Sequence, residues 1–210
     1  MKHKKFDFRT AYIDVLLNVL TGIIFLFILT TLMIQPQKKQ DEGIKKNAEY
    51  IMNVEWHKDI DCDVDVWVQD PANNVVYFQQ RDKGIMHLER DDLGFRNDIV
   101  SVVPGNTINV VENRETWVLR GIVPGIYTVN VHLYGCRIDG VAVMMGQDYN
   151  VPVMIELFKI NPKYTLVTKK EVILNKVWEE ISVMNFQLDT NGNVINITND
   201  YKQLVKSKIP

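Results

Sequence analysis

The sequence lacks most of the patterns by which enzymes and nucleic-acid-binding proteins are recognised. It has no G-x-S-x-G elbow, no phosphate-binding P-loop and no G-x-G-x-x-G fingerprint. Its four histidines fall in no H-E-x-x-H or H-x-x-x-H pattern, so a zinc centre is not expected. Lysine and arginine (24) do not outnumber aspartate and glutamate (26), which argues against a nucleic-acid partner. We therefore expect neither an enzyme nor a cofactor.

Cysteine is also scarce, and the two cysteines bear on the compartment in which the protein works. Cys62 and Cys136 both lie in strand-like segments, and neither belongs to a redox C-x-x-C motif. One pair in an exported domain suggests a disulfide, whereas two buried reduced thiols fit the same sequence equally well. Both possibilities stay open from the sequence alone.

Charge is nearly missing from one long stretch. From Ala11 to Ile34 the single charged residue is Asp14. A helix of about 20 apolar residues spans the hydrocarbon core of a bilayer, which is roughly 30 Å thick. The apolar part of a cleaved signal peptide is shorter, about 7–15 residues, and ends at small residues that the segment after Thr30 does not offer. The stretch therefore predicts an uncleaved transmembrane helix over 11–34.

A polar stripe runs along this predicted helix. Thr10, Asp14, Asn18 and Thr21 are spaced i, i+4, i+8 and i+11, so they share one helical face. Ionisable residues inside membranes usually face a bundle interior or a wet cavity, where they mark ion paths or proton relays. The alternative is that Asp14 lies near the membrane edge, where it reaches interfacial water or tunes helix packing. We favour the first interpretation, in which Asp14 is the ion-carrying residue.

The basic residues around the helix leave its orientation undecided. They flank it on both sides, as Lys2, Lys4, Lys5 and Arg9 before it and Lys38, Lys39, Lys45 and Lys46 after it. Large domains cross the membrane largely regardless of such charges. We therefore expect a cytoplasmic tail over 1–10 and a C-terminal domain outside the cytoplasm.

After a short basic N-terminus, the residues F-R-T-A-Y-I-D-V-L-L-N-V-L-T-G-I-I-F-L-F-I-L resemble the single membrane helix of the MotB, ExbD and TolR proteins. The resemblance covers about residues 6–36. It implies a bacterial inner-membrane stator subunit with a periplasmic C-terminal domain, in which Asp14 binds and releases a proton or a sodium ion. It also implies that two copies of this chain stand inside a pentamer of a multi-span partner similar to MotA, ExbB or TolQ, surrounded by membrane lipid.

The sequence departs from that family after the helix. We find no OmpA-like peptidoglycan-binding signature and no compact mixed α/β domain of the ExbD and TolR type. The extracytoplasmic anchor is therefore expected to differ, and the sequence does not identify it. A membrane-tethered β-sandwich that binds a ligand or scaffolds a complex, without ion transport, is the alternative function.

A polar, lysine-rich connector follows over 35–54. Ile44, Ala48, Ile51 and Met52 form a thin apolar stripe at helical spacing. The stripe indicates a linker helix in solvent. The resemblance implies the other possibility, an amphipathic segment that plugs the ion path.

The remainder, 55–199, predicts an all-β, antiparallel, sandwich-like domain. Segments in which polar and apolar residues alternate are separated by Gly, Pro and Asn turns, and Thr190-Asn191-Gly192-Asn193 is a hairpin signal. The predicted strands are 63–70, 75–78, 117–119, 127–134, 149–158, 164–168, 181–188 and 194–197. A C-terminal tail over 200–210 follows, with a short helix near 200–206.

Acidic and aromatic residues of this domain are candidates for contacts with a metal ion or a carbohydrate. Several aspartates are weak calcium candidates because carboxylate oxygens suit that ion, namely Asp61, Asp63, Asp65, Asp91 and Asp92. They form no EF-hand loop, so we expect a solvated strand face and an acidic loop rather than a metal site. Tryptophans in strands belong more often to a core than to a carbohydrate platform, and we expect this of Trp56, Trp67, Trp117 and Trp178.

Overall fold

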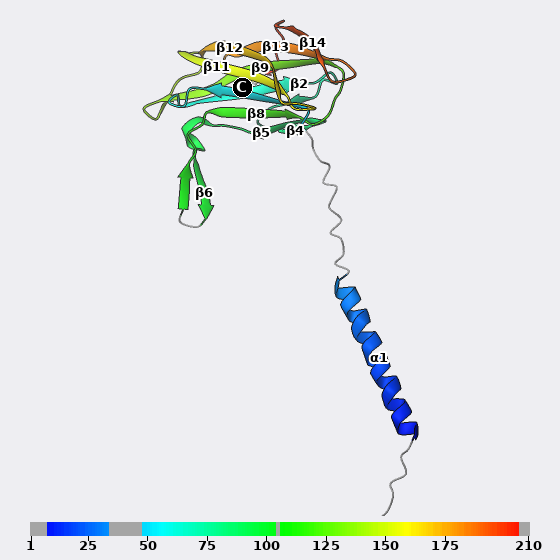
Figure 1. Ribbon diagram of the computed structural model, residues 1–210. Helices are drawn as coiled ribbons and strands as arrows, with labels where there is room; N and C mark the ends of the chain where they lie inside the picture. Colours follow the sequence, from blue (N-terminus) through cyan, green and yellow to red (C-terminus); the bar gives the residue numbers. More distant parts are fainter. Residues whose placement is uncertain (1–7, 34–47, 104–105, 206–210) are drawn as a thin grey trace, which may run out of the picture. The chain divides into compact units, whose positions relative to one another are not determined.

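The computed structural model describes residues 8–33, 48–103 and 106–205, which form an N-terminal helical unit and a C-terminal β unit (Figure 1). The helical unit is α1 (Phe8–Met33), a single helix of 26 residues. Its segment Ala11–Thr31 is long and apolar enough to cross a membrane, a test that an N-terminal signal sequence also passes. The predicted helix is therefore confirmed as a helix.

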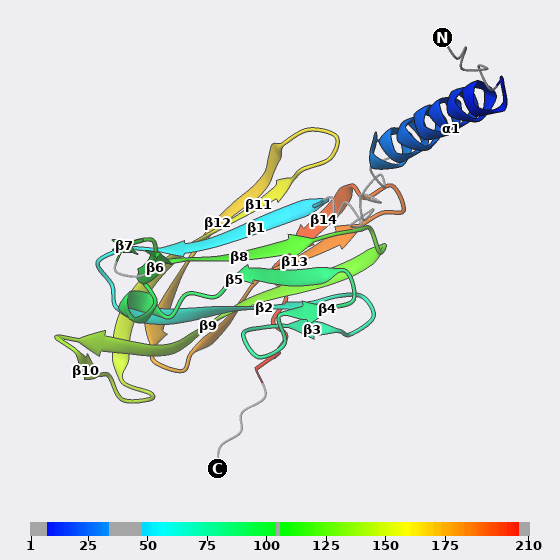
Figure 2. The ribbon, with the colours of Figure 1, turned by 90° about the horizontal axis from the view of Figure 1, so that it is seen from below.

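The β unit contains two antiparallel sheets, which run across the molecule in Figure 2. In order, the first sheet is β12 (Thr165–Lys176), β11 (Asp148–Lys159), β1 (Tyr50–Trp56), β8 (Arg114–Leu119), β5 (Met86–Arg90) and β4 (Asp82–Lys83). The second sheet is β14 (Val194–Thr198), β13 (Glu180–Leu188), β9 (Gly125–Ile138), β2 (Cys62–Gln69) and β3 (Val75–Val76), with β10 (Val141–Ala142) on the end of β9. A separate hairpin of β6 (Ile99–Val103) and β7 (Asn106–Asn109) follows a short 3-10 turn, η1 (Gly94–Arg96).

The hydrophobic core lies between the two sheets because alternate residues of each strand point inward. In β1, Tyr50, Met52 and Val54 are fully buried while the residues between them are only partly buried. Aromatic rings meet across the sheets, since Phe186 of β13 lies 6.4 Å from Trp117 and 6.3 Å from Tyr50, measured between ring centroids. This packing confirms an all-β, sandwich-like domain with antiparallel sheets.

The turns are formed by residues that suit them. Asp70 accepts backbone N–H bonds from Ala72 and Asn74 at 2.9 and 2.8 Å, which fixes the turn between β2 and β3. Asp189 does the same for Asn191 and Asn193 at the predicted hairpin between β13 and β14. That hairpin signal is therefore confirmed.

Several boundaries differ from the sequence prediction. The connector over 35–54 was predicted to contain Ile51 and Met52, but both lie in β1, so the β unit begins by Tyr50; residues 34–47 lie outside the described residues. Alternation within a buried strand outweighs the coincidental helical spacing of these two residues. The short helix near 200–206 is wrong for the described part, since 200–205 are irregular.

Irregular structure at the C-terminus has a packing role. Glu180 accepts backbone N–H bonds from Leu204 and Val205 at 2.7 and 3.0 Å, and Asn130 donates to the Lys202 carbonyl at 2.6 Å. Leu204 and Val205 thereby bury Trp67. The tail is therefore held by hydrogen bonds to side chains of the second sheet.

Candidate functional site

The polar stripe predicted on the membrane-type helix is continuous in α1. Asp14, Asn18 and Thr21 lie at helical spacing within one uninterrupted helix, and Thr10 belongs to the same helix one turn before Asp14. Every residue of 11–31 is exposed within its own unit.

The polar groups of α1 differ in whether the helix itself satisfies them. Thr21 donates its hydroxyl to the Leu17 carbonyl at 2.8 Å, and Thr30 and Thr31 likewise bond to carbonyls of the preceding turn. Within the described residues, the side chains of Asp14 and Asn18 form no such bond. In a bilayer, groups such as these threonines would face lipid at little cost, whereas Asp14 and Asn18 would need partners from outside the helix.

A second acidic group lies where the two sheets of the β unit meet. Asp65 of β2, Asp91 after β5 and Glu115 of β8 each bring a carboxylate oxygen within 4.8 Å of the other two. Asp65 is 2 % exposed and Glu115 is 0 % exposed, while Asp91 is half-buried. Glu115 also accepts the Val66 backbone N–H at 2.6 Å, so the residue of one sheet reaches a strand of the other.

Burial changes the acidity of this group. Removal from water raises the pKa of Glu115 well above its usual value, and the nearby charge of Asp65 adds to the effect. Burial also raises the pKa of Asp65. A hydrogen bond from His132 and the charge of His132 lower this pKa in part. The His132 ring nitrogen Nδ1 lies 3.5 Å from Asp65 Oδ2, and His132 is itself buried.

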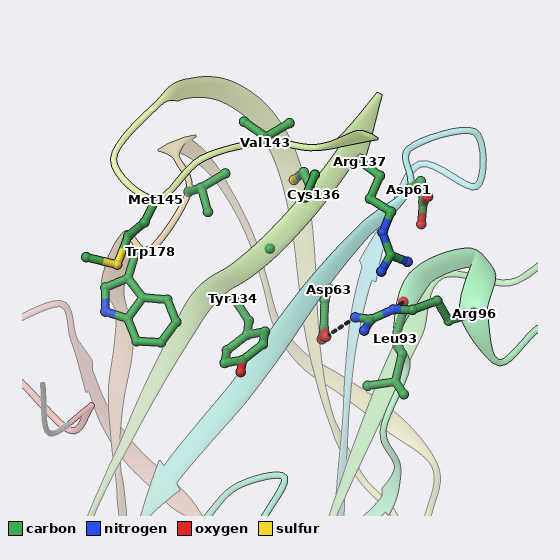
Figure 3. A pocket seen from close by; sticks show the side chains of 13 residues that line it. Asp61, Asp63, Leu93, Arg96, Tyr134, Cys136, Arg137, Val143, Met145 and Trp178 are labelled. Carbon is green, nitrogen blue, oxygen red and sulfur yellow. Dashed lines mark hydrogen bonds and ion pairs between the residues drawn. The ribbon is translucent and has the colours of Figure 1, made fainter. Parts of the chain in front are cut away.

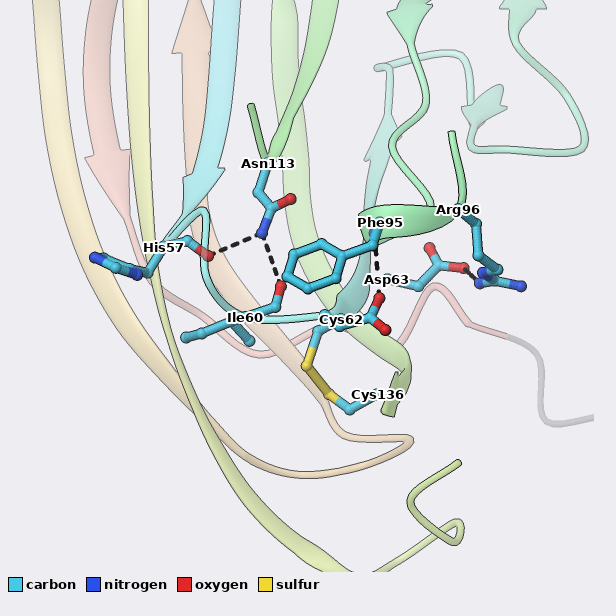
Figure 4. The surroundings of a disulfide bond; sticks show 9 residues. His57, Ile60, Cys62, Asp63, Phe95, Arg96, Asn113 and Cys136 are labelled. Carbon is cyan, nitrogen blue, oxygen red and sulfur yellow. Dashed lines mark hydrogen bonds and ion pairs between the residues drawn. A yellow bond between two sulfur atoms is a disulfide. The ribbon is translucent and has the colours of Figure 1, made fainter. Parts of the chain in front are cut away.

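The other aspartates predicted as calcium candidates are engaged elsewhere. Asp63 forms an ion pair with Arg96 at 2.8 Å (Figures 3 and 4); burial and then the charge of Asp65 nevertheless raise its pKa to about 7. Asp92 pairs with Arg90 at 2.7 Å, and Asp61 accepts the Phe95 N–H at 3.1 Å. The predicted solvated strand face is wrong, because Asp63 and Asp65 are both buried.

Sequence reasoning missed Glu115, although a signal was present. Glu115 precedes Trp117 and Leu119 at strand spacing, and all three point inward. An acidic residue on the core side of a strand is unusual, and this pattern identifies it.

A disulfide joins Cys62 of β2 to Cys136 of β9, which are direct cross-strand partners (Figure 4). Both cysteines are buried, at 1 % and 4 % exposed. Nearby, Asn113 donates two bonds of 2.8 Å to the carbonyls of His57 and Ile60, as Figure 4 also shows. The loop between β1 and β2 is thus held at the end where the disulfide lies.

Two neighbouring surface cavities share aromatic walls. Tyr134 and Trp178 line both; one cavity also contains Arg96 and Arg137, which lie across from the two rings in Figure 3. The other is lined by Trp67, stacked on Tyr77 at 4.1 Å between ring centroids, together with Phe78 and the amides of Asn73, Asn74, Gln79 and Gln80. Of the four tryptophans, Trp56 and Trp117 belong to the core as predicted, and Trp178 does not.

Trp178 is also unusual in its backbone. Its φ of 78° lies in the left-handed region, which bulky residues rarely adopt. Its N–H donates to the Leu133 carbonyl at 2.7 Å, which holds the turn against β9. The side chain is thereby fixed beside Tyr134, with 5.3 Å between ring centroids.

No family model, curated protein or solved structure matches this chain. The resemblance to the MotB, ExbD and TolR proteins therefore rests on the residues of the helix alone.

Proposed function

We propose that this chain is the single-pass subunit of an ion-driven membrane complex, in which Asp14 takes up and releases a proton or a sodium ion. In this proposal α1 spans a bacterial inner membrane with the N-terminus in the cytoplasm, and the β unit lies in the periplasm. The observation that carries the proposal is the unsatisfied pair of Asp14 and Asn18 on an otherwise apolar helix. The protein performs mechanical work or rotation rather than enzymatic chemistry.

The free-energy cost of placing Asp14 and Asn18 in lipid supports the presence of a partner subunit. An aspartate at the centre of a membrane helix costs about 2.5–3.5 kcal/mol on insertion scales, which is an upper limit for Asp14 because it lies in the N-terminal part of α1. The helix supplies no compensating bond to Asp14 or Asn18 within the described residues, in contrast to Thr21. A multi-span subunit similar to MotA, ExbB or TolQ, in five copies around two of these helices, removes the cost by enclosing the polar face.

The carboxylate then couples ion movement to motion. The charged form of Asp14 requires a wet path or a polar partner, whereas the neutral form can pass a dry surface. A membrane potential supplies about 2.3 kcal/mol per charge per 100 mV. Alternation between the two environments drives one subunit in steps against the other.

The properties of the β unit suit a role outside the cytoplasm. Its disulfide persists in oxidising compartments, and its two-sheet core is a rigid body to which an anchor can attach. In the proposal this unit transmits force to an extracytoplasmic anchor. The aromatic cavities are the candidate attachment points.

The experiment is to co-purify the chain with a multi-span membrane protein encoded beside it, reconstitute the complex in vesicles and measure ion uptake under an imposed potential. Asp14→Asn is expected to assemble normally and to abolish uptake, because the amide cannot titrate. Asp14→Glu is expected to retain part of the flux. Thr21→Val is the matched control on the same face and should retain full flux, since this hydroxyl bonds only within the helix. Full flux in Asp14→Asn contradicts the proposal.

A second candidate function is a membrane-tethered binding protein without ion transport. The observation in its favour is the pair of cavities walled by Tyr134 and the strained Trp178. Rings beside amide groups are the usual surface for carbohydrate. This function predicts that Trp178→Ala abolishes binding and activity while Asp14→Asn leaves both unchanged.

A further inference from the structure

We propose that Asp65, Asp91 and Glu115 form a calcium-binding site that joins the two sheets of the β unit. The three residues come from β2, from the segment after β5 and from β8, and their carboxylate oxygens converge within 4.8 Å of one another. The site is separate from Asp14 and does not depend on the function proposed for that residue.

Convergence of acidic groups is not sufficient by itself, and a second observation supports a ligand here. Glu115 is completely buried, and its Oε1 atom has no hydrogen-bond partner, while Oε2 accepts the Val66 N–H. Asp91 Oδ1 also lacks a hydrogen-bond partner. A buried acceptor without a donor costs roughly 1–3 kcal/mol, so the cluster is incomplete as it stands.

The surrounding charges leave the cluster negative. Within the described part of the chain, no lysine or arginine forms an ion pair with Asp65, Asp91 or Glu115. Two arginines of neighbouring segments are paired with other carboxylates, as Arg96 pairs with Asp63 and Arg90 with Asp92. Of the three carboxylates, His132 pairs with Asp65, which leaves Asp91 and Glu115 without a basic partner within the described residues. A divalent cation compensates the remainder.

The donor chemistry favours calcium over other ions. Each of the three residues offers a carboxylate oxygen, the hard ligand that calcium prefers, and water can complete the 6–8 oxygens that this ion binds. Magnesium usually keeps several waters and is bound through one or two carboxylates, so a site that supplies three carboxylates suits calcium better.

Calcium would act as a clamp between layers. Glu115 belongs to the first sheet and Asp65 to the second, so one ion ties both to the loop that carries Asp91. Within the described residues, this edge of β2 pairs with β3 through Val68 and Gln69 alone, so the part of the strand around Asp65 has no strand neighbour on that side. The ion therefore closes the sandwich where main-chain pairing does not.

The test uses the full chain in detergent micelles, stripped with EDTA and titrated with calcium chloride by calorimetry. We expect one calcium ion per chain in the wild type and at least tenfold weaker binding in Glu115→Gln and in Asp91→Asn. The matched controls are Glu171→Gln and Asp139→Asn, which change exposed residues of the same types and should bind as the wild type does. Magnesium is expected to bind at least tenfold more weakly than calcium.

Asp91→Asn decides the outcome if Glu115→Gln does not fold, because Asp91 is only half-buried. Circular dichroism of each variant establishes that it is folded before titration. The proposal is overturned if the wild type shows no saturable calcium binding, if folded Asp91→Asn binds calcium as tightly as the wild type, or if magnesium binds equally well.

Discussion

Asp14 lies in an apolar helix, and Asp65 and Glu115 lie inside a β-sandwich, so all three occupy positions that carboxylates normally avoid. Such positions are retained when something compensates the charge. For Asp14 the proposed compensation is a membrane partner and a transported ion. For Asp65 and Glu115 it is a bound cation. The same physical rule, applied to single residues, thus leads to two different ligands.

The burial of two tyrosines, Tyr50 and Tyr127, predicts how the stability of the protein changes at alkaline pH. Desolvation raises the pKa of Tyr50 and of Tyr127 to about 12, and nearby acidic residues add to the effect. The pKa of each phenol is higher in the folded protein than the value of about 10 in the unfolded chain, so burying the neutral phenol stabilises the fold below pH 10. This stabilisation is lost as the pH rises from about 10 to 12. An alkaline titration followed by tyrosinate absorbance should show two of the eight tyrosines ionising late, together with unfolding.

Tyr50→Phe tests the assignment. Tyr50 donates its hydroxyl to the Gly192 carbonyl at 2.7 Å, so the variant should lose about 1 kcal/mol of unfolding free energy and one late-ionising group. Tyr77→Phe is a control, because this phenol is not fully buried. Simultaneous ionisation of all tyrosines near pH 10 in the folded protein contradicts the prediction.

At the scale of elements, alternation in the sequence predicted most strands, because polar and apolar residues alternate wherever one face of a strand is buried. β2, β9, β11, β13 and β14 lie where that pattern predicted them. β1 was missed because Ile51 and Met52 also fit a helical stripe with residues before them. The β6–β7 hairpin was missed because its described side chains at 106–109 are all exposed and so carry no pattern.

The site was less predictable than the strands. The five predicted calcium candidates come from one strand face and a later acidic loop, yet ion pairs with Arg90 and Arg96 remove two of them from the cluster. Glu115 joins from a distant strand. The packing of one sheet on the other decides which carboxylates meet, and no local sequence pattern encodes that packing.

The disulfide gives a prediction for the link between β2 and β9. Cys62 and Cys136 are 74 residues apart, so closing this loop contributes about 4 kcal/mol in the chain-entropy model. Replacing both cysteines by alanine should lower the free energy of unfolding by about this amount, measured by denaturant unfolding of the full chain in micelles. Reduction of the wild type should have a similar effect. A mass measurement that finds two free thiols in exported protein contradicts the link.

At the scale of the whole molecule, the proposal concerns stoichiometry. An exposed polar face of Asp14 and Asn18 disfavours a solitary helix in lipid. We predict two copies of this chain with five copies of a multi-span partner, counted by native mass spectrometry of the purified complex. Asn18→Leu should reduce assembly more than ion transfer per assembled complex, because an amide cannot carry a proton. Leu16→Ile, a change among apolar residues, is the control. An active native complex that lacks any other membrane protein contradicts the prediction.

The position of β1 has a mechanical consequence. The chain that leaves α1 enters the β unit through this strand, which is paired on both sides, with β8 and with β11. Tension along β1 therefore loads two ladders in shear, and their hydrogen bonds must break together rather than one after another. An edge strand pulled outward would peel open at a much lower force. In the proposed function, entry through an interior strand would therefore let the β unit carry load without opening at its first strand.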